Sequence, residues 1–168
     1  GMGPNVETRE RDFWNAVADA SDGRLDGVLS YRDYLREQSL IWREVHGLAL
    51  GLCGTNLEGT EALDLGCGIG IASVVLAERG ARVTALDIAE KMVAATTDRA
   101  RRAGLAERVE GRVGTLEDLA RAGPRFDLIF AGAVLHHLPN FARDVRALAA
   151  MVRPGGRLVG YEPLSSLL

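Results

Sequence analysis

The sequence contains few of the residues that mark secreted, membrane-spanning or nucleic-acid-binding proteins. Its 168 residues include only two cysteines, Cys53 and Cys67, which are too few for a disulfide framework or a zinc site. A reduced, cytoplasmic compartment is therefore expected. No apolar run approaches the roughly 20 residues of a membrane span, and the first residues do not resemble a signal peptide. With one lysine, Lys91, and a net charge of −3, the chain is expected to bind neither nucleic acid nor a membrane surface.

What is present is the composition of one globular domain, 47% hydrophobic and 26% charged. The chain is long enough to bury a core without disulfides, so its whole length is interpreted as a single domain. Residues 1–58 are expected to form an N-terminal helical cap, with a short helix around Trp14 that ends at Asp22 and Gly23. Apolar residues spaced three and four apart predict a longer helix over residues 31–50.

Residues 59–168 alternate between expected strands and expected helices. Short apolar runs predict the strands, and glycines or a proline follow the helices that connect them. The predicted strands are 62–65, 82–86, 109–113, 126–131 and 157–161, and the predicted helices are 71–79, 90–103 and 141–152. This alternation predicts βαβ units and an α/β core with a mostly parallel sheet.

A glycine-rich loop follows the first predicted strand and precedes a helix. Gly66, Gly68 and Gly70 let the backbone turn tightly and approach a ligand where a Cβ atom would collide, and the helix offers unpaired N–H groups there. The carboxylate of Asp64, at the edge of the loop, can accept hydrogen bonds from an ammonium group. Dinucleotide-binding proteins use the longer spacing G-x-G-x-x-G over a pyrophosphate. The G-x-G-x-G spacing beside an acid therefore favours a positively charged ligand over a nicotinamide dinucleotide.

A second acid, Asp87, follows the second predicted strand, 17 residues after Gly70. In a βαβ unit an acid at this place accepts hydrogen bonds from the hydroxyls of a ribose. Taken alone, Asp87 is equally compatible with an acid that begins the next helix. Together with the glycine loop, it makes a ligand site the stronger interpretation.

Four ordered motifs resemble those of class I S-adenosylmethionine-dependent methyltransferases, and most closely the small-molecule branch related to quinone-biosynthesis methyltransferases. They are residues 64–70, 86–88, 126–129 with His136 and His137, and 153–158. The resemblance implies a Rossmann-like, doubly wound, mostly parallel sheet with the strand order 3-2-1-4-5. It also implies that S-adenosylmethionine binds across the carboxyl ends of strands one to four and methylates a small-molecule acceptor, leaving S-adenosylhomocysteine.

The resemblance also assigns contacts to the methionine, ribose and adenine parts of the cofactor. These are Asp64, Gly66, Cys67, Gly68 and Gly70 for methionine and ribose, Asp87 for the ribose hydroxyls, Ile88, Met92, Thr115 and Leu116 for the adenine, and Ala131 and Gly132 for the methionine end. Thr115 departs from the family, which usually has an acid there as the acceptor for the adenine amino group. Ala89 stands where a helix-capping serine is usual, and Asp87 or Glu90 is expected to replace that cap in part.

His136 and His137 follow the fourth predicted strand on the expected acceptor side, and they are the candidate catalytic residues. Either could take a proton from an acceptor hydroxyl. Both could instead form pocket walls, because methyl transfer can rest on positioning and desolvation alone. His46 is interpreted as a packed or surface residue, Cys67 as structural, and no metal site is predicted. A partner or regulatory subunit that binds S-adenosylmethionine without catalysis is the alternative function.

The fifth predicted strand is expected to be an exposed edge. In the family a helix and two more strands normally follow it, whereas seven residues follow Tyr161 here. Either the chain is part of a longer protein, or two copies associate at this edge. A homodimer through strand five, with Leu164, Leu167 and Leu168 in the interface, is the favoured expectation. N-terminal helices folded over the open side are the alternative.

Overall fold

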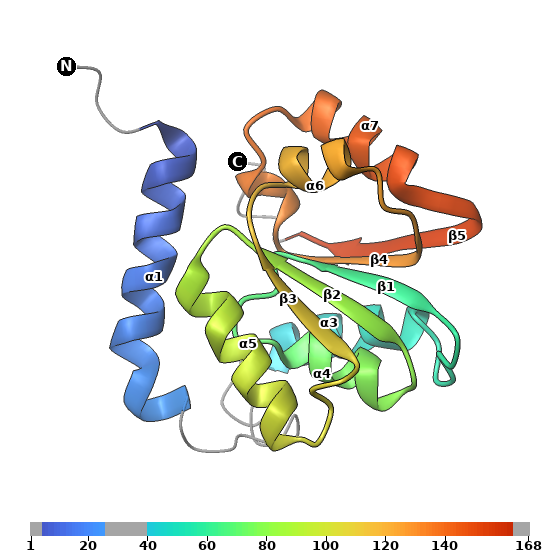
Figure 1. The fold of residues 1–168 in the computed structure, drawn as a ribbon, viewed down its shortest axis with the longest axis horizontal. Coiled ribbons are helices and arrows are strands. Elements are labelled where there is room, and N and C mark those ends of the chain that lie inside the picture. The colour runs from blue at the N-terminus through green and yellow to red at the C-terminus, as the bar shows by residue number, and fades with distance from the viewer. Residues whose placement is uncertain (1–4, 26–39, 163–168) are drawn as a thin grey trace.

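A five-stranded parallel sheet forms the centre of the computed structural model, which describes residues 5–25 and 40–162 (Figure 1). The strand order is β3-β2-β1-β4-β5, and all four neighbouring pairs are parallel. The strands are β1 (Glu61–Leu65), β2 (Arg82–Asp87), β3 (Val109–Val113), β4 (Phe126–Gly132) and β5 (Val152–Tyr161). The predicted Rossmann-like fold and strand order are confirmed.

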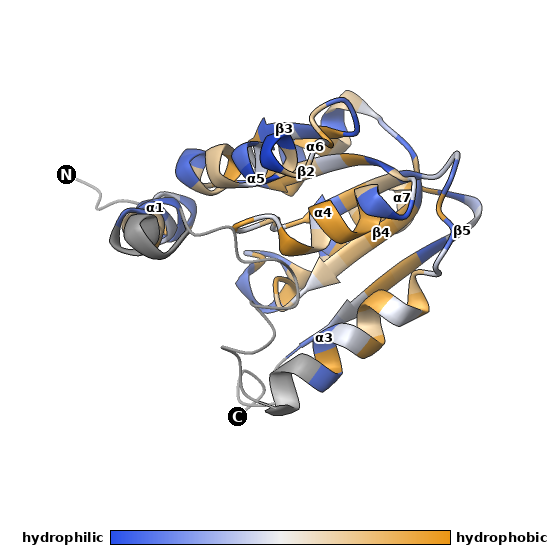
Figure 2. Ribbon diagram, turned by 90° about the horizontal axis from the view of Figure 1, so that it is seen from below, coloured by the Kyte–Doolittle hydropathy of each residue, from blue (hydrophilic) through white to orange (hydrophobic). Residues whose placement is uncertain are grey.

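Helices cover both faces of this sheet, as Figures 1 and 2 show. Three helices lie on one face and two on the other, and a further helix packs beside α5 rather than on the sheet. The first three are α3 (Leu40–Leu52), α4 (Ile71–Glu78) and α5 (Glu90–Arg102), the next two are α6 (Leu116–Ala122) and α7 (Phe141–Met151), and the last is α1 (Val6–Leu25). None of these described helices is long and apolar enough to cross a membrane.

The two halves of the core follow from the alternation of side chains along each strand. In β4, Leu128 and Phe130 belong to the cluster that packs with α3, α4 and α5, whereas Ile129 and Ala131 belong to the cluster under α6 and α7. All four side chains are at most 1% exposed. A parallel strand covered on both faces is apolar at successive positions, which explains why β4 was predictable as an apolar run.

One predicted helix end and the predicted start of the fifth strand were wrong. Helix α1 continues through Asp22 and Gly23 to Leu25. One glycine inside a helix costs only about 1 kcal/mol and does not by itself end the helix. Helix α7 ends at Met151 and β5 begins at the next residue, so Pro154 lies inside a strand rather than in a loop. A proline is tolerated there since β5 is at the edge of the sheet. The predicted helix over 31–50 corresponds to α3, and its part before residue 40 lies outside the described residues.

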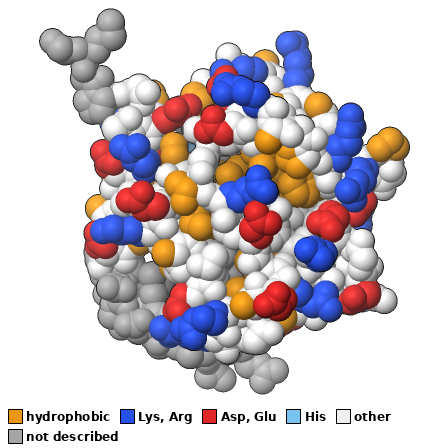
Figure 3. Space-filling model, viewed as in Figure 1, with side chains coloured by type: hydrophobic (Ala, Val, Ile, Leu, Met, Phe, Trp, Pro, Cys, Tyr) orange, Lys and Arg blue, Asp and Glu red, His pale blue; other side chains and the backbone are white. Residues whose placement is uncertain are grey.

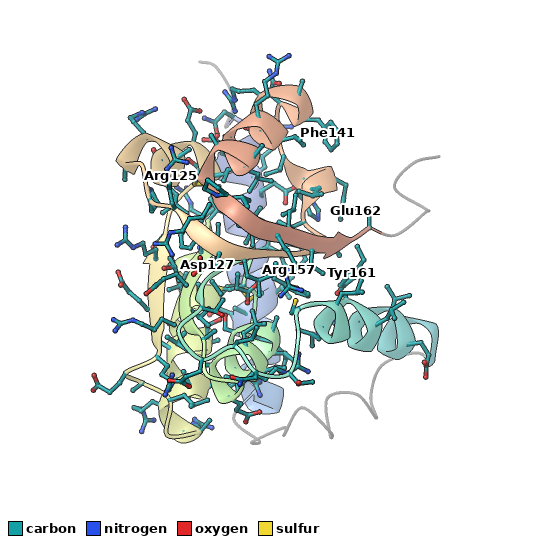
Figure 4. The ribbon with its side chains drawn as sticks, turned by 90° about the vertical axis from the view of Figure 1, so that its right-hand side faces the viewer. Arg125, Asp127, Phe141, Arg157, Tyr161 and Glu162 are labelled. Carbon is teal, nitrogen blue, oxygen red and sulfur yellow. The ribbon has the colours of Figure 1, made fainter. Side chains whose placement is uncertain are left out.

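Helix α3 is tied to the edge strand β5. The guanidinium group of Arg157 donates hydrogen bonds to the backbone oxygens of Leu52 and Cys53, each at 2.8 Å. Figure 4 views the molecule from this side and shows Arg157 and Tyr161 on the strand with α3 beneath it. Within residues 5–25 and 40–162, β5 pairs with β4 alone. An N-terminal helix therefore covers one face of the edge strand, while its backbone edge has no strand partner in the described part of the chain.

Candidate functional site

A pocket of about 640 Å³ lies at the carboxyl ends of the strands. This volume is typical of small-molecule sites, roughly 300–1,000 Å³. Most of its wall falls into two parts, and Arg143 and Asp144 of α7 and Tyr161 of β5 also line it. The strand wall consists of loops after β1, β2, β3 and β4, and the helix wall consists of residues from α1 and α3. From the helices come Val6, Glu7, Glu10, Trp14, Val17 and His46.

The three loop glycines differ in what surrounds them, although all have left-handed φ angles of 69°, 53° and 88°. A Cβ atom on Gly66 would lie 2.5 Å from Cγ2 of Val134, and one on Gly70 would lie 2.8 Å from Cα of Thr96. At Gly68 no described atom lies within 4 Å of that position, and Gly68 lines the pocket. Gly68 therefore leaves open space for a ligand. Gly70 does not line the pocket; a glycine is required there because a side chain would collide with Thr96 of α5.

Asp87 joins this loop to the start of α5. Its Oδ2 atom accepts a hydrogen bond from the backbone N–H of Gly68 at 3.0 Å, and its Oδ1 atom accepts one from the N–H of Ala89 at 2.9 Å. This second bond satisfies the N–H of Ala89 itself and does not cap α5, so the predicted replacement of the cap by Asp87 or Glu90 was wrong. The N–H of Lys91 in the first turn of α5 instead donates to Oδ1 of Asn15 in α1. Burial raises the pKa of Asp87, and its backbone hydrogen bonds oppose that shift. Because an ionised carboxylate has about four lone-pair sites, Asp87 keeps capacity for a ligand.

Asp64 lines the pocket and is 2% exposed. It accepts a hydrogen bond from Oγ of Ser73 at 2.7 Å. Burial raises the pKa of Asp64 to about 6, and the negative charge of Asp87 adds to the effect. A cation bound beside Asp64 would favour its ionised form.

The residues predicted to flank an adenine all reach the pocket. Ile88, Met92, Thr115 and Leu116 are part of its lining. Thr115 also begins α6, where its hydroxyl accepts a hydrogen bond from the N–H of Asp118 and the carboxylate of Asp118 accepts one from the N–H of Thr115. This reciprocal arrangement is a capping box. The threonine found where the family has an acid is therefore used to start a helix.

At the end of β4 the structure separates the two predicted methionine-end residues. Ala131 is fully buried in the core and does not line the pocket, whereas Gly132 does. A Cβ atom on Gly132 would lie 3.2 Å from Oη of Tyr161, so a glycine allows the tyrosine ring to pack there. The next residue, Ala133, has a φ of 52°, which is costly for an L-residue. The backbone of residues 132 and 133, rather than 131, thus forms this part of the wall.

His46 lies in the pocket wall, which the sequence did not predict. It is 5% exposed, its Nδ1 atom is 3.0 Å from Oη of Tyr161, and its ring meets the ring of Phe130 edge-on. Burial lowers the pKa of His46 to about 4, so the ring is neutral at neutral pH. The prediction of a packed residue was therefore incomplete. Apolar periodicity could place His46 on a helix, but it carries no signal for contact with a residue 115 positions away.

The two candidate catalytic histidines occupy the short 3-10 helix η1 (Leu135–His137), with their ring centroids 3.9 Å apart and their Nδ1 atoms beside different glutamates. His137 lines the pocket, and its Nδ1 atom is 3.3 Å from Oε2 of Glu10. His136 does not line the pocket, and its Nδ1 atom is 2.5 Å from Oε2 of Glu162. The geometry therefore gives only His137 direct access to a bound ligand.

Comparison with known proteins places this geometry in a family. The family model described as "Methyltransferase domain" matches residues 63–160, more than half of the chain. The chain belongs to this methyltransferase family. It is 43% identical over 100 residues to a ubiquinone biosynthesis O-methyltransferase from Methylobacterium sp. (strain 4-46), a match that covers 60% of this chain and 39% of that protein. A second such protein, from Xanthomonas euvesicatoria pv. vesicatoria (strain 85-10), is 38% identical over 103 residues, covering 61% of this chain and 42% of that protein.

Solved structures are similar to this methyltransferase domain in fold. An S-adenosylmethionine-dependent methyltransferase from Mesorhizobium loti has 31% identity and a TM-score of 0.59, with 69% of this chain and 52% of that chain covered. Magnesium protoporphyrin IX methyltransferase from Synechocystis PCC 6803 has 22% identity and a TM-score of 0.67, with 99% and 84% covered. The predicted resemblance to small-molecule methyltransferases is confirmed. The chain spans about two-fifths of the length of the curated relatives it matches.

In the described part of the chain, the pocket contains neither a reactive thiol nor a group of side chains able to hold a metal ion. Burial raises the pKa of the Cys67 thiol well above its ordinary value, and the thiol accepts a hydrogen bond from Oγ1 of Thr96 at 3.3 Å. Such a buried, protonated thiol is a packing group in this methyltransferase domain. Among residues 5–25 and 40–162, no three His, Cys, Asp or Glu side chains are grouped to hold a metal ion.

Proposed function

We propose that this methyltransferase domain binds S-adenosylmethionine in the pocket and transfers its methyl group to a small-molecule acceptor. The observation that carries the proposal is the hydrogen bond between Gly68 and Asp87. It holds the one loop position with open space for a ligand beside a carboxylate suited to ribose hydroxyls. Acidic and basic side chains are intermingled on the face in Figure 3, which supports a small-molecule acceptor rather than nucleic acid.

Each part of the cofactor has a matching part of the wall. The ribose hydroxyls donate to Asp87, and the ammonium group of the methionine end lies toward Asp64 and the backbone after Gly132. The adenine lies among apolar side chains and the edge formed by Thr115 and Leu116. The remaining residues of this proposed site are Gly66, Cys67, Gly68, Gly70, Ile88, Met92 and Ala131, with Gly70 and Ala131 supporting the wall from behind. When bound, the cofactor supplies a methyl group attached to a positively charged sulfur.

The chain's own residues then position an acceptor and exclude water. Trp14 and Val17 of α1 line the pocket together with His137, whose ring meets that of Trp14 edge-on. The relatives named O-methyltransferases support an oxygen acceptor. We assign to His137, rather than His136, the acceptance of the proton from that oxygen, because only His137 lines the pocket.

Calorimetry with S-adenosylhomocysteine and with NAD tests the cofactor assignment directly. We expect binding of S-adenosylhomocysteine and none of NAD; the reverse result would contradict the proposal. A second experiment incubates the protein with isotope-labelled S-adenosylmethionine and a panel of phenols and catechols. Transfer of label to any of them supports an enzyme, whereas cofactor binding without transfer to this panel favours the partner or regulatory subunit.

We also propose that two copies associate through β5; the expected interface residues Leu164, Leu167 and Leu168 lie outside the described residues. In the described part of the chain the backbone edge of β5 has no neighbouring strand, and Leu158 remains 44% exposed. An edge of this kind favours pairing with another chain. Light scattering over a wide concentration range should find a dimer. A monomer at every concentration would support the alternative, in which α3 alone protects this side.

A further inference from the structure

Two neighbouring histidines of η1 each face a glutamate, but only one of these pairs belongs to the pocket. His137 and Glu10 both line it, and Glu10 comes from α1, far from η1 in the sequence. His136 and Glu162 form the other pair outside the lining. The structure thus contains two pairs of the same chemistry at adjacent positions, one facing the proposed acceptor and one not.

Glu10 is held in place rather than extended freely from α1. The indole N–H of Trp14 donates a hydrogen bond to Oε2 of Glu10 at 3.1 Å, the same oxygen that faces His137. The Trp14 ring meets the His137 ring edge-on with 5.9 Å between centroids. One aromatic side chain therefore contacts both the carboxylate and the imidazole.

Helix α1 is itself anchored to α5. The backbone N–H of Lys91 donates to Oδ1 of Asn15 at 3.1 Å, and the ammonium group of Lys91 forms an ion pair with Asp19. Ala18 packs in a buried cluster with Met92. These contacts hold α1 against α5, and α1 in turn places Glu10 in the pocket wall.

We propose that Glu10 is the positioning residue for His137, so that α1 completes the proton-accepting group of the methyltransferase. This inference rests on the proposed function. A carboxylate beside Nδ1 favours the tautomer that carries its proton on Nδ1. That tautomer leaves the lone pair of Nε2 available as a base. The carboxylate also stabilises the imidazolium ion that forms when Nε2 takes a proton.

The resulting step balances in atoms and charge. Nε2 of His137 takes the proton of an acceptor hydroxyl while the oxygen forms a bond to the methyl carbon. The bond from that carbon to sulfur breaks, and its electron pair stays on sulfur. The products are the methyl ether, neutral S-adenosylhomocysteine and an imidazolium ion beside Glu10, which later releases its proton to water.

The test compares Glu10→Gln with Glu162→Gln, the matched change in the neighbouring pair. We expect Glu10→Gln to lower kcat roughly ten- to hundredfold on the best acceptor of the phenol panel. KM for that acceptor and the affinity for S-adenosylhomocysteine should stay within about threefold. Glu162→Gln should leave kcat within about threefold. Equal kcat for the wild type and Glu10→Gln would overturn the proposal, as would an equal loss in both variants.

A double variant separates positioning from a structural role. If Glu10 acts through His137, Glu10→Gln should have almost no effect in a His137→Ala background. A full further loss in that background would overturn the proposal. Failure of the wild type to bind S-adenosylhomocysteine would instead contradict the proposed function itself.

Nitrogen-15 NMR of the imidazole rings at pH 8, with S-adenosylhomocysteine present, provides a readout that needs no acceptor. We expect His137 to carry its proton mainly on Nδ1 in the wild type and in Glu162→Gln. In Glu10→Leu, which cannot accept that proton, the Nε2–H form should predominate. An unchanged tautomer in Glu10→Leu would overturn the proposal even if every acceptor in the panel failed.

Discussion

The strand wall and the helix wall of the pocket are built in different ways. In the strand wall, residues at the ends of neighbouring strands make the contacts: the carboxylate of Asp87, the last residue of β2, accepts a hydrogen bond from the backbone N–H of Gly68 in the loop after β1. In the helix wall, side chains from distant segments carry it, as in the contact between His46 and Tyr161. The first wall is set by local chain conformation, and the second depends on how α1 and α3 pack.

This difference suggests that the strand wall binds the cofactor and that the helix wall acts on the acceptor. The strand wall offers fixed acceptors and open space at Gly68, which suit a cofactor of constant shape. The helix wall offers titratable and aromatic groups, Glu10, Trp14 and His46, around the remaining space. We therefore expect changes in the strand wall to act mainly on cofactor affinity. Changes in the helix wall should act mainly on turnover and on pH dependence.

The largest expected effect comes from Gly68→Val. A valine side chain would project into the space at Gly68 where no described atom lies within 4 Å, and would occupy the cofactor position. We expect the affinity for S-adenosylhomocysteine, measured by calorimetry, to fall at least about a hundredfold, or roughly 3 kcal/mol. The domain should still unfold cooperatively.

Gly123→Val is the control for backbone strain. Gly123 has a left-handed φ of 75° and open space around it, but it lies at the end of α6 and outside the lining. Both variants should lose similar stability, because valine is strained at positive φ, and only Gly68→Val should lose binding. Retained affinity in Gly68→Val would remove the argument that the loop needs glycine for close approach.

A smaller loss is expected from Asp87→Ala. The variant removes the acceptor for two ribose hydroxyls and also the partner of the Gly68 and Ala89 N–H groups. Affinity for S-adenosylhomocysteine should fall at least about tenfold, and the free energy of unfolding should fall by about 1–3 kcal/mol.

Asp127→Ala separates the loss of cofactor affinity from the loss of stability. Asp127 also accepts from a backbone N–H, that of Glu61, and from Arg153, but it lies at the opposite end of the sheet. Its loss should lower stability and leave affinity unchanged. If Asp87→Ala and Asp127→Ala behave alike, the ribose assignment is wrong.

The sequence predicted the sheet well because its signals are local. The boundaries of strands β1 to β4 were correct to within one residue. Strand β4 is a clear apolar run, whereas β3, with Glu110 and Arg112, carries a weaker pattern. Helix α6 was missed although Thr115 and Asp118 form its capping box, because seven residues are too few for a visible apolar period. The start of β5 was missed because Pro154, Gly155 and Gly156 resemble a loop.

The residues of the candidate site also fall into those that local sequence signals predict and those that they do not. Motif spacing alone predicts that Asp64, Gly68 and Asp87 lie together, and all three line the pocket. Glu10 and His46 could not be found this way, since each meets a residue at the other end of the chain. Motifs record contacts within one βαβ unit, whereas helix packing brings together residues with no fixed spacing.

The smallest expected effect concerns two buried groups, one in each wall, whose pKa values shift in opposite directions. The pKa of Asp64 is raised from 3.8 to about 6 by burial, so its favourable contribution to stability is complete below pH 3.8 and is lost as the pH rises through 6. The pKa of His46 is lowered from 6.5 to about 4 by burial, so its contribution is present above pH 6.5 and is lost as the pH falls through 4. Between pH 4 and 6, therefore, Asp64 lowers the free energy of unfolding as the pH rises, whereas His46 raises it.

In a variant that lacks Asp64 or His46, the pH dependence of the free energy of unfolding should follow the remaining group. In Asp64→Asn, the free energy of unfolding should rise with pH between 4.5 and 5.5 by about 1 kcal/mol more than in the wild type, because only His46 still titrates of the two. In His46→Gln it should fall with pH by a similar amount relative to the wild type. Urea unfolding at pH 4.5, 5.0 and 5.5 measures both slopes. Curves parallel to the wild type in both variants would show that neither wall buries its titratable group as the structure describes, whereas one parallel curve would locate the failure in that wall alone.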